Sequence, residues 1–563
     1  MKYTRLGDLL VDAGVINDDQ LSEALAQQKA TKKRLGEQLI DSGVITERQL
    51  IGALTRQLGI EFVDLTNTEI APEMTQLVSK NIAKKYSVVP VSTRGDELYL
   101  AMVDPLNFIA TEEVKAASRK RVVPMIATSA AMDHAISVLY GTEGAKRAIR
   151  EMQAESEEDA AFATGAQVTR VEDPQAAPTI RLVDTIVERG VADRASDIHI
   201  EPREDDMRVR MRIDGILHDD LAIPKELQQS VTARLKIMCG MDVTERRIPQ
   251  DGRTITSIKG KEVDIRASTL PTVYGEKIML RLLDRESQEA VPEKLGYYGA
   301  NLDKLNSLLT NRAGVILLVG PTGSGKSSTM FAMLSQLNTE EVNIVTLEDP
   351  VEYKIDGVNQ VQVNEKTGMT FASGLRSILR QDPDIIAVGE IRDGETADIA
   401  MRAAVTGHLV LSTVHTSDAL STIDRLDDLG VAPYMVSTAL KGVISQRLLR
   451  RICPHCKQEY EASVEELAML DMDPAANAGV RFFRGAGCSE CFGSGYRGRI
   501  AASEILVVDD ALKNAIHLRS PREEILAAVN ASGFSPIIEN CRDLVISGIT
   551  TAQEAFRTIN TTD

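Results

Sequence analysis

One glycine-rich stretch has the residue types and spacing of a phosphate-binding loop. The run GVILLVGPTGSGKSST places Gly-x4-Gly-Lys-Ser between an apolar segment and an expected helix, which is the context that such a loop requires. Its glycines allow backbone N–H groups to wrap phosphates, while Lys326 supplies charge at the β and γ oxygens and Ser327 ligates Mg²⁺. The predicted ATP-binding residues here are Gly320, Pro321, Thr322, Gly323, Ser324, Gly325, Lys326, Ser327 and Ser328.

An apolar strand that ends in an acid follows about sixty residues later. In DIIAVGE, Gly389 stands where many P-loop enzymes carry the Mg²⁺-facing aspartate, so Glu390 alone forms the tip of this Walker B-like strand. The spacing leaves two roles open for Glu390: polarising the attacking water, or holding Mg²⁺ through a water. An ordinary acid at a strand end is the alternative.

Acids and histidines mark two further strand ends. The run IVTLEDPVE leads a strand into Glu348, Asp349 and Glu352, and acids at the carboxyl end of a strand beside a P-loop face the ligand crevice. In TGHLVLSTVHT, His408 and His415 flank a short apolar strand, as a γ-phosphate sensor or as structural residues. The predicted catalytic residues are Glu390, Lys326, Glu348, Glu352 and His415.

Four of the six cysteines form two CxxC pairs with 31 residues between them. Such pairs supply four thiolates for tetrahedral Zn²⁺, and a site closed by four protein ligands is structural. A redox-active pair is the alternative. Cys239 and Cys541 lack this spacing and are expected in the core. The predicted zinc ligands are Cys453, Cys456, Cys488 and Cys491.

Length, charge and hydropathy bound the remaining possibilities. A chain of 563 residues is too long for one core, so three or four domains are expected. The net charge of −18, from 82 acidic and 64 basic residues, argues against a nucleic-acid partner. The apolar runs are strand-sized, and the N-terminal stretch does not resemble a signal peptide, so we expect a cytoplasmic protein without membrane insertion.

The chain opens with a duplicated phrase. Residues 5–28 and 34–57 share 13 identical positions, and their apolar spacing predicts a helix–turn–helix in each copy. Alternating strand and helix patterns follow, then an acidic stretch poor in large apolar residues that is typical of a flexible linker. The expected parts are a helical repeat (1–60), a small α/β part (61–144), the linker (145–178), an α+β arginine-bearing module (179–290) and a C-terminal α/β core (291–563), with the cysteine subdomain around 450–500.

The α+β module is dense in arginine. The alternating stretches DIHIEP, MRVRMRIDG and VDIRAST are expected to form antiparallel strands with one polar face. The arginines are concentrated in RVRMRIDG and ERRIPQDGRTI. Their arginines either reach a nucleotide, in cis or from a neighbouring subunit, or form a solvated strand face.

These motifs together resemble those of the secretion-motor ATPases. GPTGSGKS, TLEDPVE, DIIAVGEIRD and TGHLVLSTVHT match that family's Walker A, Asp box, Walker B and His box, and the family carries Gly-Glu at Walker B. SDIHIEP, RMRIDG, RIPQDGR and VDIRASTLPTVYGEKIMLRLL resemble the domain that precedes its motor core. The tetracysteine insertion is similar to that of the pilus-extension and type II secretion branches.

The resemblance implies a fold and a mode of action. The fold would be multidomain α/β: a RecA-like P-loop core with a zinc-binding insertion, preceded by a small PAS-like α+β module and an N-terminal helical plus α/β regulatory domain. ATP would bind between module and core in a ring-shaped homo-hexamer acting on an inner-membrane platform protein and cytoplasmic ring proteins. The arginines in the matching motifs are Arg210, Arg212, Arg253 and Arg266.

The duplicated phrase is similar to the cyclic-di-GMP-binding domain at the front of some of these ATPases. Two copies suit a ligand with two guanylate halves, although a protein-docking module is the alternative. The predicted cyclic-di-GMP-binding residues are Arg5, Leu6, Gly7, Leu10, Gln28, Arg34, Leu35, Gly36, Leu39 and Gln57, with Asp104 as a weaker candidate.

The sequence therefore predicts a hexameric cytoplasmic ATPase, peripheral at the inner membrane, that drives type IV pilus extension under cyclic-di-GMP control. A type II secretion motor of the same architecture is the alternative. A nucleic-acid translocase is less favoured because the chain has no Trp and only 4 % aromatic residues for base stacking. A receptor with an idle motor is disfavoured by the intact Lys326 and Glu390.

Overall fold

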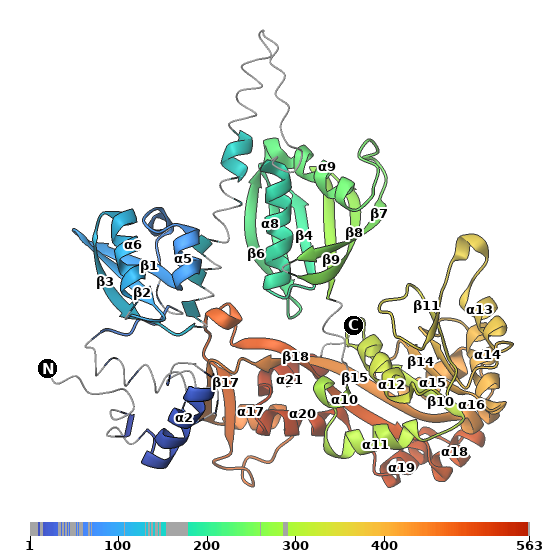
Figure 1. Ribbon diagram of the computed structural model, residues 1–563. Coiled ribbons are helices and arrows are strands. Elements are labelled where there is room, and N and C mark those ends of the chain that lie inside the picture. Colours follow the sequence, from blue (N-terminus) through green and yellow to red (C-terminus); the bar gives the residue numbers. More distant parts are fainter. Residues whose placement is uncertain are drawn as a thin grey trace. The chain divides into compact units, whose positions relative to one another are not determined.

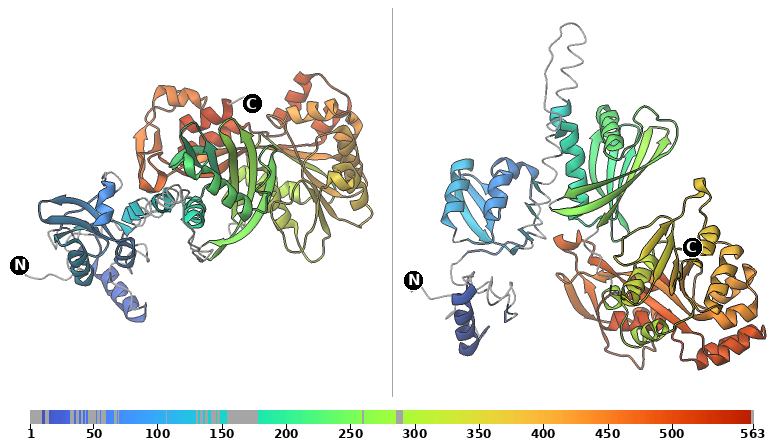
Figure 2. Two further views of the ribbon diagram at one scale, coloured as in Figure 1. Left: turned by 90° about the horizontal axis from the view of Figure 1, so that it is seen from above. Right: turned by 45° about the vertical axis from the view of Figure 1, so that its right-hand side comes forward.

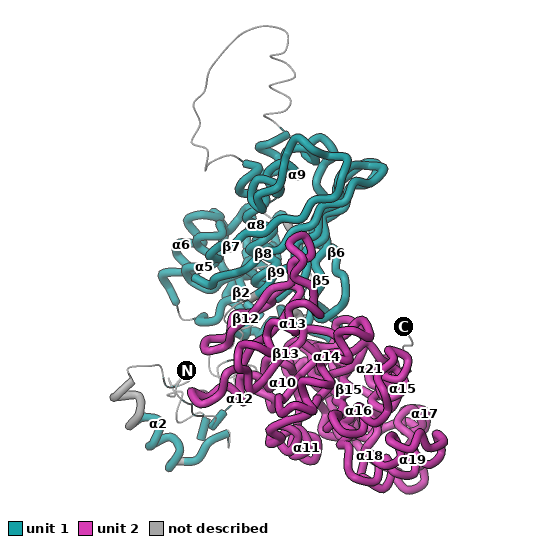
Figure 3. Tube along the Cα trace, turned by 90° about the vertical axis from the view of Figure 1, so that its right-hand side faces the viewer, with its two compact units in different colours: residues 1–283, 487–494 teal, residues 284–486, 495–563 magenta. Residues whose placement is uncertain are grey.

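A computed structural model describes most of the chain (Figure 1). The chain separates into two compact units, residues 1–283 with 487–494 and residues 284–486 with 495–563 (Figure 3). The described residues are 10–11, 15–31, 35, 39, 42, 44–45, 52, 55, 60–65, 68, 70–105, 107–129, 131–132, 135–136, 139–140, 145, 148–153, 178–258, 260–284 and 291–560.

A three-stranded sheet forms the small α/β part of the first unit. The order is β1-β2-β3, with β1 and β2 antiparallel and β2 and β3 parallel. Buried Tyr140 ties the following helical residues to this core, because its hydroxyl donates to the Val78 carbonyl at 2.8 Å. The elements are η1 (Pro72–Gln76), α5 (Lys80–Tyr86), β1 (Val88–Arg94), β2 (Glu97–Met102), α6 (Phe108–Ser118) and β3 (Arg121–Ile126).

The arginine-bearing module is a six-stranded sheet with two helices against one face (Figure 2). The order is β6-β5-β4-β9-β8-β7, and the β4–β5, β5–β6, β4–β9 and β7–β8 pairs are antiparallel, as predicted. Its elements are α8 (Pro178–Ala192), β4 (Asp197–Pro202), β5 (Asp206–Ile213), β6 (Ile216–Pro224), η2 (Lys225–Leu227), α9 (Gln228–Met238), β7 (Gln250–Ile258), β8 (Lys261–Thr272) and β9 (Gly275–Asp284).

Part of the segment expected as a linker is folded. Ala145, Ala148, Ile149 and Met152 are buried in the same core as the inner face of α8. Their spacing places small and apolar side chains on one helical face, which packs although the segment as a whole is polar.

The second unit is built on a seven-stranded sheet, β12-β11-β13-β14-β10-β15-β18, parallel except for the last strand. Alternate side chains of β10 enter different cores: Val315, Leu317 and Val319 one, Ile316 and Leu318 the other. A parallel strand covered on both faces is apolar throughout, as the sequence showed. The elements of the first half are α10 (Pro292–Leu295), α11 (Gly299–Leu309), β10 (Gly314–Val319), α12 (Lys326–Leu337), β11 (Ile344–Glu348), β12 (Asn359–Gln362), η3 (Glu365–Thr367), α13 (Phe371–Ile378), β13 (Ile385–Val388), α14 (Gly394–Val405), β14 (Leu409–Val414), α15 (Ser421–Asp428), α16 (Pro433–Ala439) and β15 (Leu440–Ile452).

The remainder of this unit adds a β-hairpin and a group of helices. Buried Phe482 on the hairpin packs with Leu449 of β15 and with α20 and α21. No helix among the described residues has both the length and the apolar character needed to cross a membrane. The elements are β16 (Lys457–Glu461), α17 (Val464–Met469), β17 (Arg481–Gly485), β18 (Tyr496–Val507), α18 (Asp510–His517), α19 (Arg522–Ala531), α20 (Ile537–Ile546) and α21 (Ala552–Asn560). Between β17 and β18 in the chain, η4 (Ser489–Cys491) belongs to the first unit.

Candidate active site

The predicted phosphate-binding loop joins β10 to α12. Its glycines Gly320, Gly323 and Gly325 have φ values of 134°, 78° and 87°, in the region that disfavours other residues. A Cβ on Gly320 would also lie 2.3 Å from the Gln446 carbonyl oxygen. Both the backbone conformation and the close neighbour therefore require glycine.

Lys326 begins α12 and is nearly buried, with 8 % of its surface exposed. Its Nζ donates to the carbonyls of Gly320 at 2.7 Å and Pro321 at 3.0 Å. The ammonium group is therefore held within the loop itself, beside the backbone that would surround a phosphate.

The other predicted catalytic residues leave the same edge of the sheet as this loop. The strands β11, β13, β14 and β10 are consecutive neighbours and run parallel. Val319 pairs with Val414, so the phosphate-binding loop and His415 follow paired residues. Glu348 ends β11, and Glu390 follows β13 by two residues. The four chain segments converge at the carboxyl edge, where open α/β sheets bind ligands.

Glu390 sits between the side chains of Arg392 and His415. Its Oε1 accepts a hydrogen bond from Arg392 at 2.5 Å, and its Oε2 lies 3.4 Å from Nε2 of His415. Burial raises the pKa of Glu390, but the hydrogen bond and charge of Arg392, with His415, outweigh burial and leave the pKa below its ordinary value. Glu390 is therefore an ionised acceptor at neutral pH, suited to orienting a water or holding Mg²⁺. Arg392 was missed from the sequence, although it stands only two positions beyond the predicted acid.

The structure gives a physical reason for Gly389. Its N–H donates to the Leu347 carbonyl at 2.8 Å, and its own carbonyl accepts from Thr413 at 2.8 Å. A Cβ at this position would lie 3.3 Å from that Leu347 oxygen and 3.4 Å from Cα of Glu348. The close approach of β11 thus leaves little room for the aspartate that many P-loop enzymes carry here.

The side chain of Glu348 is hydrogen-bonded to residues of its own strand and of the neighbouring strand β12. The side chain is buried, and Oε1 accepts hydrogen bonds from Thr346 at 2.5 Å and Gln360 at 3.0 Å. Glu352 lies half-buried in the loop after β11. Both acids belong to the carboxyl edge, and their catalytic roles remain predictions.

The four predicted arginines lie on the sheet of the other unit and interact with neighbours in it. Arg210 on β5 forms two hydrogen bonds of 2.8 Å with Glu201, and these bonds and Lys277 overcome the effect of burial and lower the pKa of Glu201 to about 2. Nε of Arg253 on β7 donates to Asp264 at 2.8 Å. Arg212 donates to the Gly215 carbonyl at 2.9 Å. Arg266 pairs with Arg253 in the β7–β8 register. Their approach to a nucleotide remains a prediction.

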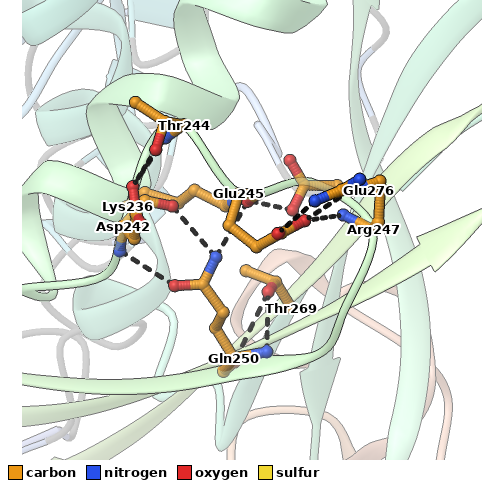
Figure 4. Close-up of polar contacts among 8 residues, drawn as sticks. All are labelled: Lys236, Asp242, Thr244, Glu245, Arg247, Gln250, Thr269 and Glu276. Carbon is orange, nitrogen blue, oxygen red and sulfur yellow. Dashed lines mark hydrogen bonds and ion pairs between the residues drawn. The ribbon is translucent and has the colours of Figure 1, made fainter.

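The buried Lys236 is hydrogen-bonded to the loop that leads into β7 (Figure 4). Nζ of Lys236 lies 2.5 Å from Glu276 and donates to the Glu245 carbonyl at 2.6 Å. Gln250 donates to the same carbonyl at 2.9 Å and accepts from the N–H of Asp242 at 2.8 Å. The start of the strand that carries Arg253 is therefore rigidly placed within the module.

The four predicted zinc ligands come together. The sulfur atoms of Cys453, Cys456, Cys488 and Cys491 all lie within 4.8 Å of one another, and those of the last pair are 3.6 Å apart. Zn–S bonds of about 2.3 Å in a tetrahedron require sulfur separations of about 3.8 Å, so this donor set fits zinc. Cys239 and Cys541 are buried elsewhere, as expected, and burial raises their pKa values to about 11 and about 12.

The described residues of the duplicated phrase show matching geometry in the two copies. Leu10 and Leu39 occupy equivalent positions, and their carbonyls accept from Val15 at 2.9 Å and Val44 at 3.0 Å. Both leucines are fully buried in one shared core, and their predicted part in cyclic-di-GMP binding stays a prediction. Packing of one copy on the other explains their burial.

The other predicted cyclic-di-GMP-binding residues are placed only in part. Leu35 packs half-buried on that core, and Asp104 is half-buried after β2. Only the backbone of Gln28, in α2 (Asp18–Thr31), is described. Arg5, Leu6, Gly7, Arg34, Gly36 and Gln57 lie outside the described residues.

Comparison with known proteins agrees with these motifs. Residues 172–557 match the family described as "Type II/IV secretion system protein", and residues 58–146 match the MshEN domain. Type IV pilus assembly ATPases PilB of Thermus thermophilus and Myxococcus xanthus are 40 % and 38 % identical over 99 % and 98 % of this chain. This chain spans 59 % of the length of the first protein and 98 % of the second.

A third relative is a type II secretion protein. Type II secretion system protein E of Klebsiella pneumoniae is 46 % identical over 381 residues, which are 68 % of this chain and 76 % of that protein. The chain belongs to the type II/IV secretion system protein family, and it is an ATP-hydrolysing enzyme of that family.

Proposed function

We propose that this chain is the subunit of a hexameric motor that hydrolyses ATP to drive type IV pilus extension under control by cyclic di-GMP. The observation that carries the proposal is the share of this chain that each relative matches. The two pilus assembly ATPases match 99 % and 98 % of this chain, whereas type II secretion proteins E match 68 % of it in the Klebsiella protein and 89 % in that of Xanthomonas campestris.

Each part of the carboxyl edge has a task in this proposal. Bound ATP with Mg²⁺ supplies the reactive phosphate. Lys326 contributes positive charge, Ser327 offers its hydroxyl to the metal, and the loop amides hold the phosphates. Glu390, kept ionised by Arg392, orients the attacking water or holds Mg²⁺ through a water, and His415 stabilises that carboxylate.

The arginines act from the other unit. Arg210 and Arg253 are paired with Glu201 and Asp264 in the described structure, so contact with a nucleotide requires an exchange of partners. That exchange couples nucleotide binding to movement of module against core, in one subunit or between neighbours in the ring.

Zinc and cyclic di-GMP have separate tasks. The four clustered thiols hold a structural Zn²⁺, which joins the two ends of the long insertion between β15 and β18. The duplicated phrase and the adjoining MshEN domain bind cyclic di-GMP, with Arg5 and Arg34 on its guanine or phosphate groups. The motor lies in the cytoplasm at the inner membrane, where it acts on a platform protein and cytoplasmic ring proteins.

The alternative is a type II secretion motor, favoured by the 46 % identity over residues shared with the Klebsiella protein. Deletion of the gene in its own bacterium separates the two. The proposal expects loss of surface pili with normal release of secreted proteins. Intact pili with loss of protein release would overturn it in favour of the alternative.

A further inference from the structure

A buried glutamine lies directly beneath the phosphate-binding loop. Gln446 on β15 is 1 % exposed, and its Nε2 donates to the Ser324 carbonyl, in the middle of the loop, at 2.7 Å. Its Oε1 accepts hydrogen bonds from the hydroxyls of Tyr297 and Thr329, both at 2.6 Å. Thr329 belongs to the first turn of α12, so the one amide group contacts both the loop and the helix that follows it.

Both ends of the phosphate-binding loop lie close to Gln446. A Cβ on Gly320 would lie 2.3 Å from the Gln446 backbone oxygen, and one on Gly325 would lie 2.8 Å from its Nε2. The first and last glycines of the loop therefore both approach the same residue. Neither glycine could carry a side chain without displacing Gln446.

The chemistry of the partners fixes which way the amide points. A backbone carbonyl can only accept, so the NH₂ end of Gln446 must face Ser324 and the oxygen end must face the two hydroxyls. Burial raises the pKa of Tyr297, which keeps its phenol protonated and able to donate. Ionised glutamate in place of Gln446 would keep the acceptor oxygen and lose the donor to the loop.

Tyr297 connects the hydrogen bonds of Gln446 to the chain segment at the start of the second unit, between α10 and α11. It is fully buried, follows α10 and precedes α11. The preceding Gly296 packs against β18 so closely that a Cβ there would lie 2.6 Å from the Ala501 oxygen. The position of the entering segment is thus tied through one glutamine to the backbone of the loop.

We propose that Gln446 is a positioning residue for nucleotide binding, which holds the Ser324 carbonyl and so sets the loop amides for the phosphates. The inference rests on the proposed use of this loop as the ATP site. Without the Nε2 donor, the Ser324 carbonyl loses its partner and the loop samples conformations that no longer bind phosphate. The loss falls on nucleotide affinity more than on the stability of the unit.

The test compares two substitutions that remove the same kind of bond. Asn301 is also buried, and its Nδ2 donates to the Ser503 carbonyl at 2.8 Å, on the β18 side of the unit. Gln446→Glu and Asn301→Asp each replace an amide donor by a carboxyl group in the full chain. Titration with Mg-ADP should show a dissociation constant raised about tenfold for Gln446→Glu and within about twofold of the parent for Asn301→Asp.

Unfolding temperatures of the same samples separate positioning from general damage. We expect both variants to unfold at a similarly lowered temperature, with only Gln446→Glu weak in nucleotide binding. Equal affinities in the two variants would overturn the inference. If Gln446→Glu does not fold, Tyr297→Phe replaces it. Removal of one donor to Oε1 should raise the dissociation constant about threefold with little thermal change, and unchanged affinity would again overturn the inference.

A further variant distinguishes failure of the inference from failure of the proposed function. Lys326→Ala should abolish Mg-ADP binding by the full chain. If Lys326→Ala binds as tightly as the parent, the loop is not the nucleotide site, and the inference falls together with that assignment. If Lys326→Ala loses binding while Gln446→Glu and Tyr297→Phe retain it, the assignment stands and the inference alone fails.

Discussion

His415 and Glu390 face each other from adjacent strands, with Nε2 of the histidine 3.4 Å from Oε2 of the glutamate. Glu390 also binds Arg392, so one carboxylate is shared by an arginine and a histidine at the carboxyl edge of the sheet. This arrangement keeps the acid ionised and oriented, as a residue that positions water or metal must be.

Glu390→Gln should separate binding from turnover. The amide keeps the size of the side chain and loses the charge that Arg392 stabilises, so ATP turnover should fall by at least about a hundredfold while nucleotide affinity changes little. Steady-state hydrolysis and a binding titration on the full chain measure the two effects. Normal turnover in this variant would exclude Glu390 from catalysis.

Acid should weaken the arginine-bearing module through Glu201. Because the folded-state pKa is lowered to about 2, its stabilising effect is fully present above its ordinary value near 4.5 and is lost as the pH falls toward 2. The difference in unfolding free energy between parent and Glu201→Gln should therefore be large at pH 6 and shrink toward pH 2. Glu226→Gln, at an exposed position, serves as the matched control for the substitution itself. A difference that does not change with pH would contradict the assigned ion pair.

Zinc should be bound once per chain and should stabilise the segments that carry the four cysteines. Cys453→Ser removes one of four clustered thiols, so zinc content should fall and the unfolding temperature should drop by at least about 5 °C. Cys541→Ser, outside the cluster, should retain the metal. Metal analysis that finds far less than one zinc per parent chain would rule out the tetrathiolate site.

Cyclic di-GMP should bind the full chain saturably in a calorimetric titration. Arg5→Ala/Arg34→Ala should remove binding, because one arginine of each repeat is lost. Lys32→Ala/Lys33→Ala removes the same charge between the copies and should leave binding unchanged. Absence of binding by the folded parent chain would leave the repeat as a docking module, and binding that survives in the arginine variant would exclude the two arginines as ligands.

The sequence predicted those features whose chemistry is local. The phosphate-binding loop, the strand-end acids and the CxxC pairs each combine a few residues at short spacing with strict conformational demands, so their placement at the sheet edge and in one thiol cluster could be expected. The antiparallel pattern of the arginine-bearing strands was equally clear, because alternating polarity follows the pleat.

Features set by distant packing were not predictable. Gln446 and Tyr297 are 149 positions apart, and nothing near either residue marks them as partners. Leu10 and Leu39 have the same local pattern whether they contact a ligand or the other repeat, so their burial in a shared core could not be predicted. The apolar face of residues 145–152 was hidden because the surrounding stretch is acidic.

The most direct test of the account is complementation of a deletion strain with three forms of this gene. The parent chain should restore surface pili, and the Lys326→Ala and Glu390→Gln chains, expressed to the same level, should not. Pili restored by either variant would contradict the claim that ATP hydrolysis at this site drives their extension.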